Sequence, residues 1–253
     1  MLPVVGMSVI VTGGGSGIGA ATAAHFVGRG ARVTICGRRE DRVRQVAEEL
    51  GAACTWVRAD VSVPEDRAAL VRAAVEHGGG IDVLVHGAAD MYRGPLAELE
   101  EDRLIRLLHG NVVGPMMLTG AALPHLVERR GCVILFGSVH VKRAFPGASP
   151  YAASKGALET LTGVLAAELG PQGVRVSCVR PGAVLTEINQ RAGLFDDETA
   201  ARRIADLGPA HALGRPGSVQ EIAEAIEYLA RAEWTTGAVM VVDGGLGLGT
   251  TNA

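Results

Sequence analysis

Tyr151 and Lys155 lie four residues apart, so on a helix their side chains share one face, with Cβ atoms about 5–6 Å apart. Moving a proton to or from an alcohol near neutral pH requires a group whose pKa is close to the working pH. A free tyrosine, with a pKa of about 10, is too weak an acid for this. An ammonium group about 4–5 Å from the phenolate stabilises it by roughly 3–4 kcal/mol at an effective dielectric constant near 20, which is about 2–3 pKa units. The pair therefore predicts a general acid/base, Tyr151, whose pKa is lowered by Lys155.

Ser138 is the third candidate, because it follows the apolar run 132–136, which is typical of a buried strand. A serine at the carboxyl end of such a strand faces the crevice where open α/β sheets bind ligands, so its hydroxyl could polarise a substrate oxygen. The helix that carries Tyr151 is expected to begin with Ser149 as N-cap and Pro150 at its first position. The alternative is a solvated Tyr and Lys on an ordinary amphipathic helix, which a short motif does not exclude by itself.

The elements that would position these residues alternate along the chain. Strand patterns occur at 7–12, 32–36, 54–57, 81–85, 132–136, 174–180 and 237–242. Helical patterns lie between them at 20–29, 41–50, 64–77, 94–126, 151–169 and 218–231. This order predicts one doubly wound α/β (Rossmann) domain over 1–253, with a central parallel seven-stranded sheet flanked by helices.

A glycine-rich segment joins the first strand to the first helix. Glycines in this position let the backbone approach a pyrophosphate, which then sits at the helix N-terminus. The alternative, a plain tight turn, is less favoured because of the strand–helix context. The expected contacts are Gly13, Gly15, Ser16, Gly17, Ile18 and Gly19.

The end of the second strand bears on the choice of cofactor. Folds of this kind that bind NAD place an acid there for the ribose hydroxyls, whereas arginine accommodates a 2′-phosphate. Here Gly37 occupies the acid position and is followed by Arg38 and Arg39. A guanidinium can bind a phosphate and stack on adenine, so we expect NADP(H) to be preferred and NAD(H) to remain possible. The alternative is that these arginines are solvated loop residues.

Other cofactor contacts are expected where later strands end. Asp60 could bind the adenine amino group or be an ordinary turn acid, and Gly87 and Ala88 would let the nicotinamide ribose approach closely. Asn111 could bridge Lys155 through a water or only satisfy local backbone groups. The remaining predicted contacts are Val61, Pro181, Gly182, Val184 and Thr186, together with Tyr151 and Lys155.

Composition limits the class of protein. The formal net charge of −3 over 253 residues argues against a dedicated nucleic-acid binder. The four cysteines are far apart without a Cys-x-x-Cys pair, which favours buried free thiols over disulfides, a reactive thiol or a metal site. We find no apolar run of membrane-spanning length and no basic segment before an apolar one. We therefore expect a cytoplasmic protein with no membrane partner and no metal.

These residues together resemble the short-chain dehydrogenase/reductase family, and the resemblance covers essentially the whole chain. It is carried by Thr12-Gly13 with Gly17-Ile18-Gly19, Asp60-Val61, Asn111, Ser138, Tyr151 with Lys155, Pro181-Gly182 with Thr186, and Asp243-Gly244-Gly245. The resemblance implies hydride transfer between nicotinamide and a ketone or secondary alcohol, without a metal. It also implies that Asn111, Ser138, Tyr151 and Lys155 form the active site.

Within this resemblance, tyrosine is the acid/base, serine positions the substrate oxygen, lysine holds the nicotinamide ribose, and asparagine anchors a water to the lysine. A tetramer or dimer through the helices 111–126 and 151–169 is also implied. The chain departs from the family where the usual Asn-Asn-Ala-Gly is replaced by His86-Gly87-Ala88-Ala89. We expect His86 to brace the sheet rather than to take part in catalysis.

The substrate is expected to be a fairly bulky, partly apolar ketone or alcohol in a mostly apolar pocket with a polar handle. Residues 187–213 are polar and irregular and are interpreted as a mobile lid, and 246–253 as a flexible tail. The alternative function is a catalytically silent cofactor-binding sensor or scaffold. The predicted substrate contacts are Met91, Ser138, His140, Phe145, Tyr151, Ile188 and Phe195.

Overall fold

A single parallel sheet of seven strands, in the order β3-β2-β1-β4-β5-β6-β7, forms the centre of the protein. The computed structural model describes residues 1–188, 192–194 and 196–249. The strands are β1 Ser8–Thr12, β2 Arg32–Gly37, β3 Cys54–Arg58, β4 Val83–Val85, β5 Cys132–Phe136, β6 Arg175–Pro181 and β7 Val239–Val242. All seven predicted strands and the doubly wound architecture are thus confirmed.

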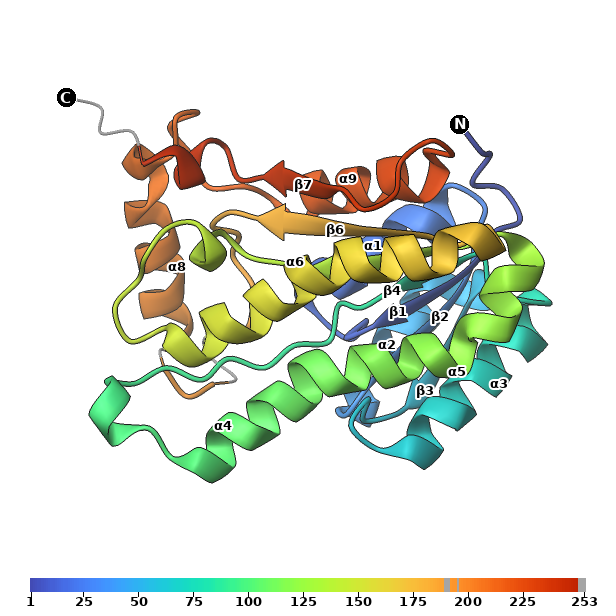
Figure 1. Cartoon of the computed structure of the whole chain (residues 1–253), viewed down its shortest axis with the longest axis horizontal. Helices are drawn as coiled ribbons and strands as arrows, with labels where there is room; N and C mark the ends of the chain where they lie inside the picture. The colour runs from blue at the N-terminus through green and yellow to red at the C-terminus, as the bar shows by residue number, and fades with distance from the viewer. Residues whose placement is uncertain (189–191, 195, 250–253) are drawn as a thin grey trace.

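Helices cover both faces of the sheet, and in Figure 1 α5 and α6 lie in front of the strands. The α-helices of the described residues are α1 Gly17–Gly28, α2 Glu40–Leu50, α3 Pro64–Gly78, α4 Glu101–Leu108, α5 Gly114–Arg129, α6 Ser149–Leu169, α8 Asp197–Asp206 and α9 Val219–Arg231. Every residue of β1 is buried, as expected for a parallel strand covered on both faces.

The hydrophobic core has two parts, one on each face. Phe26 of α1, Val43 of α2 and Ile226 of α9 pack with one set of strand side chains. On the opposite face, Leu118 of α5 and Leu158 of α6 pack with the alternate set. Since successive strand residues point to opposite faces, the continuous apolar runs of the sequence supply both parts. The carboxyl ends of the strands are thereby fixed at one edge, where the predicted site residues follow them.

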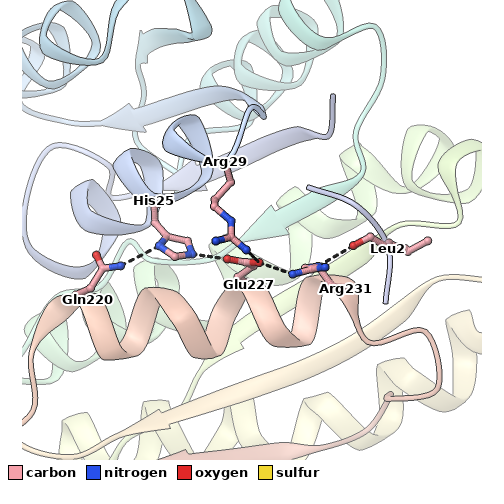
Figure 2. A network of polar contacts seen from close by, with 6 residues as sticks. All are labelled: Leu2, His25, Arg29, Gln220, Glu227 and Arg231. Carbon is pink, nitrogen blue, oxygen red and sulfur yellow. Dashed lines mark hydrogen bonds and ion pairs between the residues drawn. The ribbon is translucent and has the colours of Figure 1, made fainter. Parts of the chain in front are cut away.

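A polar network around the buried Glu227 joins α1 to α9 on the first face (Figure 2). The Glu227 carboxylate accepts hydrogen bonds from Arg29 at 3.0 Å and Arg231 at 2.7 Å, and lies 2.5 Å from His25 Nε2. Arg231 also donates to the main-chain carbonyl of Leu2, at 2.7 Å. The network therefore connects the first helix, the last helix and the amino-terminal segment.

The clearest differences from the sequence predictions concern the start of α6, the 187–213 segment, the 94–126 region and the predicted tail. Helix α6 begins at Ser149, so Ala148 rather than Ser149 is its N-cap, and no side chain caps it. The 187–213 segment contains α8, capped by the Asp196 carboxylate accepting from Thr199 N, and is not wholly irregular. The 94–126 region is interrupted by a π-helical turn, His109–Val113. The predicted tail begins with a short 3₁₀ turn whose Leu246 is fully buried, which anchors it.

Candidate active site

A cavity of about 420 Å³ opens at the carboxyl edge of the sheet, where it is lined by residues that follow β1, β4, β5 and β6. It is lined by Ser138 from the end of β5, by Tyr151 and Lys155 of α6, and by the glycine-rich loop after β1. Helix α8 closes its far side. Residues from segments that are distant in sequence thus meet in one space because parallel strands end at a common edge.

Tyr151, Ser138 and Lys155 are all buried, with 8%, 6% and 2% of their surfaces exposed. The Lys155 ammonium lies 5.7 Å from the centre of the Tyr151 ring, so the two side chains share one helix face as predicted. Burial raises the pKa of Tyr151 to about 12, and the nearby Ser138 hydroxyl acts in the opposite direction. Burial also lowers the pKa of Lys155 to about 8.

The expected lowering of the tyrosine pKa by Lys155 is therefore wrong for this structure. The spacing of the two residues predicts an attraction between ammonium and phenolate. It carries no information about the cost of burying the phenolate. Removal from water disfavours whichever form of a group is charged, so it acts against both the phenolate of Tyr151 and the ammonium of Lys155. At neutral pH Tyr151 is consequently protonated.

His140, predicted as a substrate contact, lies against Ser138 and Tyr151. Its Nδ1 lies 3.0 Å from Ser138 Oγ, and its main-chain N–H donates to the same oxygen at 3.3 Å. The imidazole packs 4.4 Å from the Phe145 ring and 5.3 Å, edge to face, from the Tyr151 ring. Burial, with the nearby charge of Arg93, lowers the pKa of His140 to about 4, so the ring is neutral at pH 7.

Asn111 lies within the π-helical turn and is almost fully buried. Its Oδ1 accepts from Asp90 N at 2.8 Å, and its Nδ2 donates to Asp90 O at 2.9 Å and to Ser154 Oγ at 3.1 Å. The side chain therefore braces the segment after β4 against α6, which matches the local-bonding alternative. A π-helical turn interrupts the regular pattern of main-chain hydrogen bonds, and such turns often occur at functional sites. The main-chain groups of this turn are therefore candidates for binding a water.

The glycine-rich loop is shaped for an anion. A Cβ on Gly13 would lie 2.8 Å from Ala88 N, and one on Gly19 would lie 2.3 Å from Gly13 O, so both positions require glycine. Ser16, the N-cap of α1, makes no side-chain capping hydrogen bond, and Gly17 has a φ of 53°. The first-turn N–H groups of α1 are thus available at the cavity, which fits the pyrophosphate of a dinucleotide.

A second cavity, of about 620 Å³, adjoins the first at Gly13. A Cβ on Gly37 would lie 3.0 Å from Val43 Cγ1, so an acidic side chain there would require Val43 to move. Arg38 Nη2 lies 2.8 Å from Asp90 Oδ1, which also lines this cavity. The predicted cofactor contacts that line this second cavity are Gly13, Arg38, Asp60, Val61, Ala88 and Asn111.

Arg39 and Asp60 both have partners within the protein. Arg39 Nη2 donates to Ser16 Oγ at 3.1 Å and to Glu187 Oε2 at 2.7 Å, so it connects the glycine-rich loop with the segment after β6. Asp60 Oδ1 accepts from the main-chain N and hydroxyl of Ser62, which is the ordinary role of a turn acid. Its position in the second cavity also leaves the adenine role open.

Most other predicted residues lie in the first cavity. Those found there are Ser16, Gly17, Ile18, Gly19, Gly87, Met91, His140, Phe145, Pro181, Gly182, Val184, Thr186 and Ile188. Gly15 instead packs against α2, where a Cβ would meet Val43 at 3.1 Å. Phe195 lies outside the described residues.

His86 is placed as a brace. Thr119 Oγ1 donates to Pro115 O at 2.9 Å, so it accepts the hydrogen bond from His86 Nε2, also 2.9 Å long. Burial lowers the pKa of His86 to about 3, which keeps the ring neutral. Among the described residues its Nδ1 has no hydrogen-bond partner, and His86 lines neither cavity.

Two arginines that the sequence analysis missed, Arg93 and Arg203, also line the first cavity. Neither belongs to a recognisable motif, and only the fold brings the loop after β4 near α8. An indirect signal existed for α8 itself. Asp196 can cap a helix in which Ala200 and Ile204 are four residues apart, and the apolar repeat continues at Leu207.

Comparisons with known proteins agree with this geometry. Residues 13–247 match a family model described as enoyl-(acyl carrier protein) reductase. Glucose 1-dehydrogenase of Gluconobacter oxydans (strain 621H) is 35% identical over 251 residues, covering 96% of this chain and 92% of that protein. L-fucose dehydrogenase of Bos taurus is 39% identical over 249 residues, covering 96% and 90%.

Among solved structures, the 3-ketoacyl-(acyl-carrier-protein) reductase from Brucella melitensis complexed with NADH matches with a TM-score of 0.87. It is 30% identical to this chain, and the match covers 96% of this chain and 99% of that one. The protein belongs to the short-chain dehydrogenase/reductase family and is an oxidoreductase acting on CH–OH groups. No helix among the described residues has the length and apolar character needed to cross a membrane.

Proposed function

We propose that the protein is an NADP(H)-dependent oxidoreductase that interconverts a ketone and a secondary alcohol, with Tyr151 as general acid/base. The observation that carries this proposal is the convergence of Tyr151, Ser138 and Lys155 in one buried cavity. That cavity continues to the uncapped amino terminus of α1, where a dinucleotide pyrophosphate fits. Reaction groups and cofactor cradle therefore share one space.

Each side chain has a defined task in this proposal. A bound nicotinamide would supply the hydride in reduction or take it up in oxidation. The Tyr151 hydroxyl donates its proton to the substrate oxygen in reduction, and its phenolate removes a proton from the alcohol in oxidation. Ser138 Oγ, held by the His140 N–H, donates a hydrogen bond to the same substrate oxygen. Lys155 would hold the nicotinamide ribose.

Three further features belong to the proposal. Residues 187–213, including α8, would act as a lid over the substrate, and Arg39–Glu187 would join it to the glycine-rich loop. Asn111 would bind a water through its main chain rather than its side chain. A dimer or tetramer would form through α5 and α6, whose outer faces expose Met116 and Met117. Elution as a monomer on size-exclusion chromatography would contradict the last of these.

The NADP(H) preference rests on Arg38 and Arg39 beside the second cavity and on the absence of an acid at Gly37. The direct test is a pair of fluorescence titrations with NADPH and NADH, followed by turnover of a panel of ketones. We expect tighter NADPH binding, and we expect Arg38→Ala to weaken NADPH binding about tenfold or more while NADH binding changes little. Arg44→Ala, on the exposed face of α2, is the control.

Two results would oppose this proposal. Tighter binding of NADH would show that Arg38 is not a phosphate ligand and would favour the NAD(H)-dependent alternative. Cofactor binding without consumption, with every ketone and alcohol tested, would instead favour the catalytically silent sensor or scaffold.

A further inference from the structure

Arg93 and Arg203 both line the first cavity, which also holds the groups that would carry out the reaction. Arg93 lies in the loop after β4, whereas Arg203 is on α8. Neither has a part in the reaction proposed above. Their presence in a cavity that also holds Ser138 and Tyr151 requires a separate explanation.

Arg93 is the more informative of the two. It is half-buried, and its Nη2 donates to Pro146 O at 3.2 Å. Among the described residues, no carboxylate forms an ion pair with it. Burial and the charge of Arg203 lower the pKa of Arg93, and the charge of Arg93 in turn acts on His140. A guanidinium stays charged in proteins, so two like charges face one cavity.

Two carboxylates also line the cavity among the described residues. Glu187 lines the cavity but is paired with Arg39 at 2.7 Å. Asp206 also lines it, three residues after Arg203 on the exposed side of α8. Among the described residues that line the cavity, three carry cationic groups, namely Arg93, Lys155 and Arg203, and two carry carboxylates. A bound anion would relieve the repulsion between the two arginines.

Apolar side chains also line the cavity. Met91, Phe145, Ile204 and Leu207 line it together with the arginines. This lining suits a molecule with an apolar body, a reacting carbonyl at Tyr151 and a charged group at the two arginines. Guanidinium groups bind carboxylates and phosphates through paired, charge-assisted hydrogen bonds.

We infer that the substrate carries an anionic group, joined to the reacting carbonyl or hydroxyl by an apolar body, and that Arg93 and Arg203 bind this group. The substrate class is therefore an oxo acid or hydroxy acid rather than a neutral ketone. This inference rests on the proposed function, because it takes the Tyr151 end of the cavity as the reacting end.

Binding can be tested without turnover. Straight-chain carboxylic acids from butanoate to decanoate, and the primary amides of the same lengths, contain no reducible ketone. Their affinity for the protein saturated with NADPH, measured by calorimetry, should favour the best acid over its amide by about tenfold or more. Raising the salt concentration should reduce this preference, because salt screens charged pairs.

Variants test whether the two arginines cause the preference for acids over amides. Arg93→Gln should abolish it and Arg203→Gln should reduce it, whereas Arg202→Gln should leave it intact. Arg202 is the matched control, since it neighbours Arg203 on α8, is exposed, and does not line the cavity. Equal affinity of the wild type for acids and amides already at low salt concentration would overturn the inference. Retention of the full preference in a folded Arg93→Gln variant would overturn it as well.

Turnover separates this inference from the proposed function. Oxo acids should be reduced with a kcat/KM about tenfold or more above that of their methyl esters, mainly through KM. Equal rates for acids and esters would leave the oxidoreductase proposal standing and refute the anionic substrate. An acid preference in binding with no reduction of any ketone would support the anion site and refute the proposed reaction.

Discussion

At the scale of single residues, burial shifts the pKa values of the two neighbouring groups of the candidate site in opposite directions. The pKa of Tyr151 is raised to about 12, and the pKa of Lys155 is lowered to about 8. The tyrosine is consequently held in its protonated form at neutral pH, which suits a proton donor to a carbonyl. Acting as a base toward an alcohol is less favourable under the same conditions.

Removing the Tyr151 hydroxyl tests its proposed role. Tyr151→Phe should lower the rate of ketone reduction by about 10²–10⁴-fold, the usual contribution of a positioned acid or base. NADPH affinity, measured by fluorescence titration, should change much less, because the ring and its packing remain. Tyr228→Phe, on the half-exposed face of α9, is the matched control and should keep full activity. Wild-type rates of ketone reduction in Tyr151→Phe would show that Tyr151 is not the acid/base of the reaction.

The pH dependence tests the pKa itself. With a pKa of about 12, the phenolate fraction of Tyr151 rises about tenfold per pH unit across the neutral and mildly alkaline range. The chemical step of alcohol oxidation, followed by stopped-flow absorbance in single turnovers, should therefore increase steadily between about pH 7 and 10. Ketone reduction should stay level over that range. A plateau in oxidation below about pH 9 would show that Lys155 offsets burial after all.

At the scale of elements, the end of β5 is held by an ion pair between α6 and β6. Arg180 donates from Nε to Glu159 Oε1 at 2.8 Å and from Nη2 to Oε2 at 2.5 Å, and both side chains are nearly buried. Glu159 lies one turn after Lys155, and a Cβ on Gly137 would lie 2.2 Å from Glu159 Oε1. Because Arg180 fixes the carboxylate, it cannot move aside easily, and Ser138 follows Gly137 directly.

Gly137→Ala should accordingly destabilise the protein and displace Ser138. We expect a loss of about 1–3 kcal/mol in the free energy of unfolding by urea, as for other overpacked core sites, together with reduced kcat. Gly163→Ala is the control, since Gly163 lies on the exposed side of α6 with open space around it. That substitution should stabilise the helix by up to about 1 kcal/mol. Equal stability of the two variants would show that the Glu159–Arg180 pair is free to shift.

At the scale of the whole molecule, the network around Glu227 links the amino-terminal segment and α1 to α9, which lie far apart in the sequence (Figure 2). Burial acts to raise the pKa of the Glu227 carboxyl, but hydrogen bonds from His25 and Arg231 and the charge of Arg29 outweigh it and hold the pKa below its usual value. The folded state therefore favours the carboxylate. Gln220 supports the network from its edge, with its Nε2 at 2.9 Å from His25 Nδ1.

This depressed pKa fixes the direction of a pH effect on stability. The contribution of Glu227 is complete above its unfolded pKa of about 4.3 and is lost as the pH falls through the lower folded value. At pH 7, Glu227→Gln should reduce the free energy of unfolding by about 3 kcal/mol, near the lower end for removing one partner of a buried pair. In urea titrations from about pH 7 to 3, wild type should lose this advantage over the variant.

The control for this comparison is Glu224→Gln, on the exposed face of the same helix, which should follow the wild-type pH profile. A constant difference between wild type and Glu227→Gln down to about pH 3 would mean that the carboxylate charge does not stabilise the fold.

The sequence predicts most of the fold because its strong signals are local. Apolar runs locate all seven strands, and short motifs locate the glycine-rich loop and the Tyr151–Lys155 pair. Contacts between distant segments carry no such signal, so the Glu159–Arg180 pair and the approach of Arg93 toward Arg203 emerge only from packing. The rise in the Tyr151 pKa could not be predicted for the same reason, since burial depends on the whole fold. Helix α8 was missed because its apolar residues are sparse among charged ones.

The place of β1 in the middle of the sheet has a consequence for synthesis on the ribosome. β1 pairs with β2 on one side and with β4 on the other, and β2 and β3 both precede β4 in the chain. Until β4 emerges, one edge of β1, a strand that is wholly buried in the folded protein, has no hydrogen-bonding neighbour, and unpaired strand edges attract other chains. The nascent amino-terminal half is therefore the stage at which this protein is most open to aggregation, well before the groups around Tyr151 exist as a site.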